Sequence, residues 1–305
     1  MFTELILPSP EVSMTASPSP TRTAGVRVAG LARILLPVFA GFALESCSAA
    51  RASEPGSATT YGSPVAIGNG TARVYVVFSN GAPAEVGVAL SEAAFAGLPG
   101  DGSPGGMQMP DGHHTYDYIL QLPGRNPTPY RFVGLGWNPV GHIPAGVFDQ
   151  PHFDFHFYSM TQAKWSTILP SDPEFATKAE RLPAPEFVPA GYQKLPGAVP
   201  LMGAHWVDPS SPELNGELFT RTFLYGSWDG ELTFAEPMIT KAFLETRPDI
   251  RAPIATPAKY LAPGYHPTEY RVYWNRATRE YRVALAGLVD GDRGQTRASL
   301  RTGTR

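Results

Sequence analysis

Turn-forming residues recur along the whole chain and interrupt nearly every window before a three-turn helix can form. Glycine and proline together fill about a fifth of the sequence, with 31 and 32 of its 305 positions. Inside a helix, Gly costs about 1 kcal/mol and Pro about 3 kcal/mol relative to Ala. This spacing excludes a helical bundle and a long doubly wound α/β sheet. We expect a mainly β fold, an antiparallel sandwich or barrel with a few short helices.

Charge and hydrophobic content narrow the class of protein further. The chain carries 24 basic and 27 acidic residues, a net charge of −3, and has no dense stripe of Lys or Arg. Affinity for a phosphate backbone needs such a stripe, so we expect no nucleic-acid partner. The hydrophobic share of 43% is large enough for a real core.

The single cysteine, Cys47, follows an apolar segment near the N-terminus, and arginines precede that segment. A basic region, a short apolar run and a small residue before the cleavage site are typical of a secretory signal peptide. The apolar run, residues 34–44, is shorter than the roughly 20 residues of a spanning helix. One cysteine also excludes an intrachain disulfide and a Cys-rich zinc site.

Leu44 and Ser46 before Cys47 resemble a bacterial lipobox, in which the cysteine becomes a lipidated N-terminus. We therefore interpret residues 1–47 as a signal peptide with a lipobox-like end. Plain secretion and an uncleaved anchor remain as alternatives. The expected location is outside the cytoplasm, in the cell envelope or secreted, with membrane contact only through a lipid anchor.

Composition divides the rest into a flexible linker over 48–70, a single β-rich domain over 71–288 and a polar tail over 289–305. Short apolar runs bounded by turn formers predict ten strands, and three segments have helical patterns. The strands are 71–79, 84–90, 116–122, 130–137, 152–158, 203–207, 219–225, 231–235, 269–274 and 280–286, and the helices 91–96, 173–181 and 237–246.

The most informative of these strands reads PHFDFHFY, residues 151–158. Successive side chains of a strand point to opposite faces, so three Phe share one face and His152, Asp154, His156 and Tyr158 share the other. Imidazole and carboxylate together suit Zn, Mn, Fe or Cu better than Ca, and we take zinc as the first candidate for a divalent metal. The alternative is a hydrogen-bonded polar ladder.

The spacing of the two histidines limits this hypothesis. His152 and His156 would lie roughly 13 Å apart at about 3.3 Å per residue, too far for easy sharing of one ion. A bulge could shorten the gap, or Asp154 midway between them could be the nearer ligand.

Two later residues complete the proposed set. His205 lies mid-strand beside small residues, and Glu236 lies in the apolar string FAEPM. A buried carboxylate needs a partner, a cation or a proton. We expect His152, His156 and His205 as metal ligands, Glu236 as a fourth ligand or catalytic base, and Asp154 as a catalytic group that orients a histidine or water. The alternatives are a core histidine bonded to a carbonyl and a carboxylate at a helix N-terminus.

This hypothesis makes a geometric prediction. At least two of the five residues must meet in one pocket, and His205 must be among them. His142, in the loop before residue 152, either arches over the site as a further ligand or base or is an ordinary exposed loop histidine.

No sequence signature of the common hydrolases, nucleotide-binding proteins or zincins is present. Four segments in order resemble a family of secreted bacterial proteins with a domain of unknown function, the TTHB-type domain. The segments are GHIPAGVFDQPHFDFHFY (141–158), MGAHWVDP (202–209), FTRTFLYGSWDG (219–230) and FAEPMIT (234–240). The resemblance covers roughly residues 74–286 and implies an exported, β-rich domain without assigned catalytic residues.

Three functions remain open at this point. The first is a metal-binding enzyme of the cell envelope. The second is a non-catalytic module that binds a small molecule or a metal. The third is a structural envelope protein that forms homo-oligomers. Metal content distinguishes the first two from the third, and an open coordination position distinguishes the first from the second.

Overall fold

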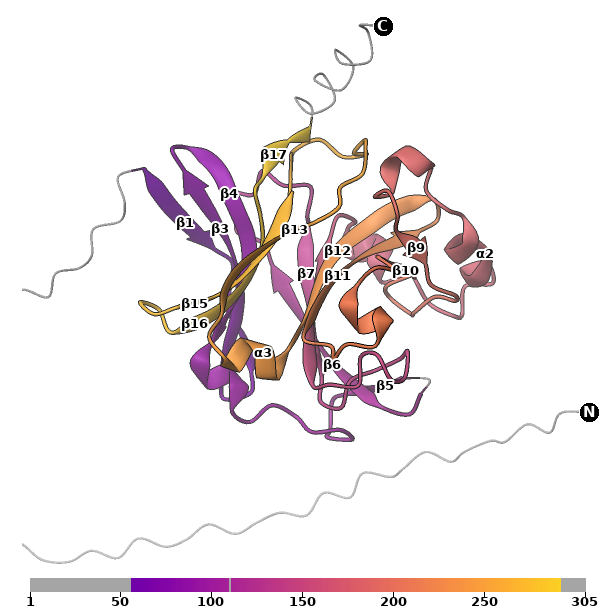
Figure 1. Ribbon diagram of the computed structural model, residues 1–305, viewed down its shortest axis with the longest axis horizontal. Helices are drawn as coiled ribbons and strands as arrows, with labels where there is room; N and C mark the ends of the chain where they lie inside the picture. Colours follow the sequence, from indigo (N-terminus) through magenta and orange to yellow (C-terminus); the bar gives the residue numbers. More distant parts are fainter. Residues whose placement is uncertain (1–55, 110, 292–305) are drawn as a thin grey trace, which may run out of the picture. The chain divides into compact units, whose positions relative to one another are not determined.

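The computed structural model describes residues 56–109 and 111–291. In this part of the chain two antiparallel sheets pack face to face as a sandwich, and no closed barrel is formed (Figure 1). The prediction of a mainly β fold is confirmed, and the sandwich is the form found. The predicted signal peptide, with Cys47, lies outside the described residues.

The first sheet combines the beginning and the end of the described chain, drawn in indigo and yellow in Figure 1. Its strand order is β1-β3-β4-β16-β15-β13, with the short β2 also paired to β3. The strands are β1 (Ser57–Tyr61), β2 (Val65–Ile67), β3 (Gly70–Ser79), β4 (Ala82–Ser91), β13 (Asp249–Pro253), β15 (Glu269–Asn275) and β16 (Glu280–Ala286).

The second sheet comes from the middle of the chain and has the order β5-β6-β7-β8-β12-β11-β10-β9. Its strands are β5 (Met107–Gln108), β6 (His114–Gln121), β7 (Phe132–Asn138), β8 (His152–Tyr158), β9 (Gln193–Lys194), β10 (Ala204–Val207), β11 (Arg221–Trp228) and β12 (Glu231–Thr240). A separate pair is formed by β14 (Tyr265–His266) and β17 (Val289–Asp290).

Helices in the described residues are short. They are α1 (Gln162–Trp165), α2 (Phe175–Glu180), α3 (Lys241–Glu245) and the 3-10 turns Glu92–Phe95, Pro185–Phe187 and Pro212–Asn215. No helix of the described residues is long and apolar enough to cross a bilayer.

The main core lies between the sheets, and β8 shows how the sequence creates it. Phe153, Phe155 and Phe157 pack there with apolar residues of β3 and β4. His152, Asp154 and His156 alternate with these phenylalanines and face away from the core, as predicted. All seven residues of β8 are nevertheless buried, because loops cover this outer face of the second sheet.

Two predicted domain boundaries differ from the structure. The linker predicted over 48–70 contains β1 and β2, because β1 pairs along its whole length with β3 while its side chains remain largely exposed. An edge strand of this kind is held by backbone hydrogen bonds, so it lacks the apolar alternation that identifies a strand in sequence. The polar tail predicted from residue 289 begins with β17, and residues 292–305 lie outside the described part.

The helix predicted over 237–246 is wrong in its first half. Pro237 lies inside β12, paired with Phe223 of β11, and only residues 241–245 are helical. The helix begins after Thr240, whose hydroxyl accepts a hydrogen bond from the backbone N–H of Phe243 at 3.2 Å. Extension of β12 through Pro237 places Glu236 in a strand, so the alternative of a carboxylate at a helix N-terminus is wrong.

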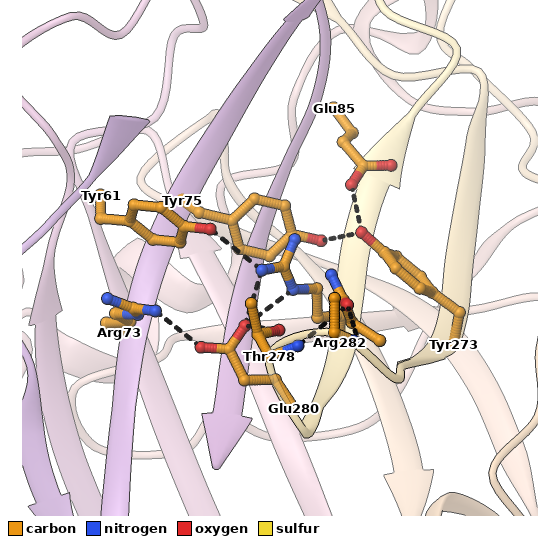
Figure 2. A network of polar contacts seen from close by, with 10 residues as sticks. Tyr61, Arg73, Tyr75, Glu85, Tyr273, Thr278, Glu280 and Arg282 are labelled. Atoms are coloured by element: carbon orange, nitrogen blue, oxygen red, sulfur yellow. Dashed lines mark hydrogen bonds and ion pairs between the residues drawn. The ribbon is translucent and has the colours of Figure 1, made fainter. Parts of the chain in front are cut away.

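The outer face of the first sheet carries a polar network of its own residues (Figure 2). Arg282 donates to Glu280 at 2.6 Å and to the Tyr61 hydroxyl at 3.0 Å, and Arg73 donates to Glu280 at 2.7 Å. The Tyr273 hydroxyl donates to Glu85 at 2.7 Å. The two carboxylates of this network thus receive hydrogen bonds from side chains beside them.

Candidate metal centre

Two neighbouring strands place a histidine and a carboxylate opposite each other on the outer face of the second sheet. The register of β12 against β8 runs from Ala235 opposite Phe157 to Met238 opposite Asp154, which sets Glu236 opposite His156. His156 Nε2 lies 3.1 Å from Glu236 Oε1, and both side chains are 2% exposed. Because opposite side chains of an antiparallel pair lie close together, the register alone brings this pair into contact.

His205 joins the same group from β10, two strands further along the sheet. Its Nε2 lies 3.8 Å from Glu236 Oε2. On the intervening strand β11, the residue paired with His205 is Gly226, which has no side chain to block the approach. The ring of Phe234 occupies the space above Gly226 and contacts both imidazoles, with centroid distances of 5.0 Å to His156 and 5.3 Å to His205. We call His156, His205 and Glu236 the first centre.

A second group lies two residues away along β8. His152 Nε2 is 3.1 Å from Asp154 Oδ1, and His142 Nε2 is 3.4 Å from Asp154 Oδ2. Asn138, the last residue of β7, donates from its side-chain amide to Asp154 Oδ2 at 2.8 Å. We call His142, His152 and Asp154 the second centre. Within each centre the three ligand-type atoms all lie within 4.8 Å of one another, as a metal site requires.

Several atoms of both centres are buried without a hydrogen bond. Among the described residues, no hydrogen bond reaches His156 Nε2, Glu236 Oε2 or Asp154 Oδ1. Buried polar atoms are almost always satisfied, so each such atom requires an explanation. The carboxylates of Glu85 and Glu280 on the other sheet, by contrast, accept hydrogen bonds from their neighbours.

The close contacts in the two centres have the spacing of ligands that share an ion. Two donors bound at about 2.0–2.1 Å to one ion, in tetrahedral or octahedral geometry, stand about 2.8–3.4 Å apart. The contacts of 3.1 Å for His156–Glu236, 3.1 Å for His152–Asp154 and 3.4 Å for His142–Asp154 fall in this range. The 3.8 Å contact of His205 is slightly longer. The residues present therefore fit a divalent metal ion.

Both centres open onto one cavity of about 360 Å³. His142 and Asp154 line it from the second centre, and all three residues of the first centre line it as well. The rest of the wall is mostly apolar, and no Lys or Arg of the described residues contributes to it. Its apolar side chains include Leu195, Val199, Met202, Leu224 and Met238. A smaller cavity of about 90 Å³ elsewhere contains none of these ligand-type residues.

Electrostatics differ between the two histidines of the first centre. Burial lowers the pKa of His205 to about 4 and outweighs the attraction of Glu236, so its imidazole is neutral at pH 7. Burial also opposes the charged form of His156, but the facing Glu236 carboxylate outweighs it and raises the pKa of His156 to about 8. Glu236 thus attracts one positive charge to this centre, on an imidazolium or on a metal ion.

In the second centre, the charges of Asp154 and its two neighbouring histidines strongly affect one another. Burial alone would raise the pKa of Asp154, but the neighbouring His152 and His142 lower it well below its usual value, so the carboxylate is ionised at neutral pH. Burial opposes the charged form of His142, but Asp154 and the Ile143 carbonyl outweigh it and raise its pKa to about 9. This carboxylate, too, attracts a cation.

The geometric prediction made from the sequence is met. Asp154, His156, His205 and Glu236 line one cavity, and His205 lies beside His156, with ring centroids 6.5 Å apart. The structure does not bring His152 and His156 to one point, because His152 contacts Asp154 in the second centre. Asp154 contacts His152, and His142 lines the cavity beside Asp154 rather than lying in an exposed loop away from it.

Two contributors were not assigned from the sequence. The sequence leaves His142 open between a ligand and an exposed loop residue, and Asn138 is not among the residues it predicts for the site. The sequence of β7, FVGLGWN, contains a signal that points to the site, because two glycines alternate with large apolar residues. Those glycines lie opposite His156 and Asp154, and their lack of side chains indicates a face that leaves room for the site. The other alternative for His205 fails, because no hydrogen bond from its ring to a carbonyl is found in the described residues.

Comparisons with known proteins add no identification. No family model, curated protein or solved structure matches this chain. The resemblance to the secreted TTHB-type domain therefore stays a prediction from sequence motifs. The assignment of the site rests on its geometry: His and carboxylate groups that could hold a metal, buried beside an apolar cavity.

Proposed function

We propose that this protein is a metal-dependent enzyme whose divalent ion is held by His156, His205 and Glu236. The observation that supports this most directly is the pair His156 Nε2 and Glu236 Oε2, both buried without a hydrogen bond at the wall of the cavity. Imidazole and carboxylate donors in this combination suit zinc, iron, manganese or copper. Zinc is the ion to test first.

Three protein ligands are the number typical of a catalytic rather than a structural zinc site, since structural sites use four. All three ligands line the cavity, so an ion held by them would be reached from it. When bound there, such an ion supplies an activated water or polarises an oxygen of the substrate. The apolar wall favours a small, largely apolar substrate with one polar group that reaches the ion.

The chain's own residues have definable tasks in this proposal. Glu236 supplies the negative charge that offsets the ion, and Phe234 holds both imidazoles in place through ring contacts. Asp154 and His142 lie at the same cavity wall and contribute the polar groups of the second centre to it.

The first test is metal binding by the full-length protein. We expect Zn²⁺ titration of metal-free protein to show tight binding, and Glu236→Gln, which keeps the shape of the side chain, to weaken the first centre at least about 10-fold. His113→Ala is the matched control, because His113 is exposed and does not line the cavity. Unchanged affinity at the first centre in Glu236→Gln would refute the proposal.

A second measurement distinguishes an enzyme from the non-catalytic binding module. Co²⁺ substituted for zinc has visible absorption bands that report its coordination. An open position predicts that azide changes these bands, whereas a closed four-ligand centre predicts no change. A spectrum insensitive to azide would favour the binding module over the enzyme.

We further propose that the chain is exported and that Cys47 becomes its lipidated N-terminus. The support is the lipobox-like sequence that ends at Cys47 and the basic, then apolar, segment before it. Mass spectrometry of protein from the envelope should find a mature chain that begins at or near residue 47. Cys47→Ala should release it from the membrane; persistent attachment would refute lipidation.

A further inference from the structure

The second centre lies outside the metal site proposed above and shares no residue with it. Its three ligand-type side chains come from β8 and from the loop that follows β7. His152 is fully buried, and Asp154 is 4% exposed. Asp154 Oδ1 is buried without a hydrogen bond and lies on the side of the carboxylate that faces His152.

Backbone carbonyls fix which nitrogen of each imidazole faces Asp154. His142 Nδ1 lies 2.7 Å from the carbonyl oxygen of Ile143, and His152 Nδ1 lies 2.7 Å from that of Gln150. A carbonyl can only accept, so each Nδ1 carries a proton and donates it. In a neutral imidazole the Nε2 is then an acceptor. Metal-binding histidines typically donate their other ring N–H in this way.

Two acceptors thus face one ionised carboxylate, which is also only an acceptor. The contacts at 3.1 and 3.4 Å require a positive charge between them, either protons on the imidazoles or a metal ion. The 3.1 Å contact of His152 lacks hydrogen-bond geometry, since Asp154 Oδ1 receives no hydrogen bond. In a hydrogen bond, the N–H of His152 Nε2 would point along the line from Nε2 to Asp154 Oδ1. A metal ion bound by both atoms lies to one side of that line. The geometry therefore favours the ion at His152.

Asn138 acts on the carboxylate. Its side-chain amide donates to Asp154 Oδ2 at 2.8 Å and, over a longer 3.3 Å, to His152 Nε2. Hydrogen bonds of this kind fix the orientation of ligating carboxylates. Asn138 thus orients Asp154 without being a ligand.

We propose that His142, His152 and Asp154 hold a second divalent transition-metal ion, so that the cavity contains two metal centres on one wall. Two residues along β8 separate the centres, about 6.6 Å at about 3.3 Å per residue. The second centre has its own ligands and does not require the first. This separation exceeds the roughly 3.5–4 Å of two-metal enzymes, so a bound molecule would need two polar groups to reach both ions.

Binding stoichiometry tests this inference. Calorimetric titration of the metal-free, full-length protein with Zn²⁺ should give two ions per chain. Asp154→Asn keeps the size of the side chain and should weaken the second centre at least about 10-fold, whereas Glu236→Gln should weaken the first to the same extent, so each variant should bind one ion with wild-type affinity. His113→Ala should still bind two, which controls for zinc held by exposed histidines.

His142→Ala provides a second variant if Asp154→Asn fails to fold, because His142 lies in a loop and its removal leaves β8 intact. It should weaken the second ion at least about 10-fold without affecting the first. A single ion in the wild type that survives both Asp154→Asn and His142→Ala would overturn the second centre. That result would not contradict the first centre. The variant Glu236→Gln tests the first centre separately.

Discussion

Gly226 governs the first centre although it is not a ligand. It lies on β11 between His205 and Phe234, and a Cβ added at this position would overlap the Phe234 ring. That ring also contacts Tyr158, with centroids 5.3 Å apart. The ring has no free space into which to move, since Phe234 is only 3% exposed. The absence of one side chain therefore fixes the position of the aromatic ring that supports both imidazoles.

We predict that Gly226→Ala lowers the free energy of unfolding by about 1–3 kcal/mol, the usual cost of an overpacked core. Zinc affinity of the first centre should fall with it, because displacement of Phe234 moves both histidines. Denaturant unfolding and zinc titration measure the two effects. Gly124→Ala is the control, since nothing lies within 4 Å of the added Cβ and no positive φ strains it; an equal loss of stability in both variants would contradict the explanation.

Glu280 is the central residue of the network in Figure 2 and gives a prediction about pH. Burial alone would raise its pKa, but hydrogen bonds from Arg282, Thr278 and Arg73 lower it from its usual value. A depressed carboxyl pKa contributes stability that is present above the unfolded pKa of about 4.3 and is lost as pH falls through the folded pKa.

Glu280→Gln should therefore lower the free energy of unfolding by about 3 kcal/mol at pH 7, because it leaves buried Arg282 without its charged partner. The difference from the wild type should shrink as pH falls below about 4, where Glu280 itself becomes protonated. Urea unfolding at pH 7 and pH 3 measures both values. Glu245→Gln, at a more exposed ion pair with Lys241, should cost less than about 1 kcal/mol. A constant difference at the two pH values would show that the charge of Glu280 is not responsible.

At the scale of elements, β8 and β10 contribute in different ways. β8 has seven residues and a full register with β7 on one side, so its histidines are held by the sheet itself. β10 has only four residues, and its position relative to β11 depends on how the chain enters it. It enters through Gly203, at φ +90°, where an added Cβ would lie 2.5 Å from the Ser227 carbonyl oxygen.

Gly203→Ala should displace the start of β10 and with it His205. We expect a loss of about 2 kcal/mol or more in stability, from a left-handed backbone that costs an L-residue about 1–2 kcal/mol and from the clash. The first metal centre should weaken while the second stays unchanged. Gly197→Ala is a matched control in the same segment, because Gly197 has φ +81° but nothing within 4 Å. If both variants weaken the first centre equally, backbone strain rather than displacement of β10 is the cause.

At the scale of the whole molecule, the two outer faces of the sandwich differ in polar pairing. The described network on the first sheet pairs Glu85 and Glu280 with donors of the protein itself. In the described strands of the second sheet, every unsatisfied buried side-chain atom except Thr233 Oγ1 belongs to the two centres, whereas the first sheet has one such atom, Arg271 Nε. A bound cation therefore stabilises the outer face of the second sheet more than that of the first. The stability of the whole protein should accordingly depend on metal.

Zinc that binds only the folded state should stabilise it by about 2.7 kcal/mol for each centre at a free concentration 100 times Kd. For a protein of this size, the stabilisation by one centre corresponds to a rise in Tm of roughly 5–10 °C. Differential scanning calorimetry with and without Zn²⁺, followed by EDTA, measures the shift and its reversal. The double variant Asp154→Asn/Glu236→Gln should show almost none of it; a rise equal to that of the wild type would place the zinc elsewhere.

The sequence by itself determined the fold class and the two faces of β8. Gly and Pro prevent long helices wherever they occur, and side-chain alternation within a strand is a local property of the backbone. Both consequences therefore follow without knowledge of distant contacts. The same reasoning found the five candidate residues, since buried carboxylates and histidines in apolar strings are visible along the chain. It failed for β1, because backbone pairing holds this edge strand without a buried apolar face, and for Pro237, because β12 continues through a residue that usually ends or begins an element.

Only the tertiary structure decided which of these residues meet. The distribution of His152 and His156 over two centres depends on the register of β8 against β12, which sets Glu236 opposite His156 and Thr240 opposite His152. The approach of His205 depends on Gly226 two strands away, and that of His142 depends on the path of a loop. Strand register and loop path are set by the sum of many weak contacts across the sheet, and no short stretch of sequence contains that sum.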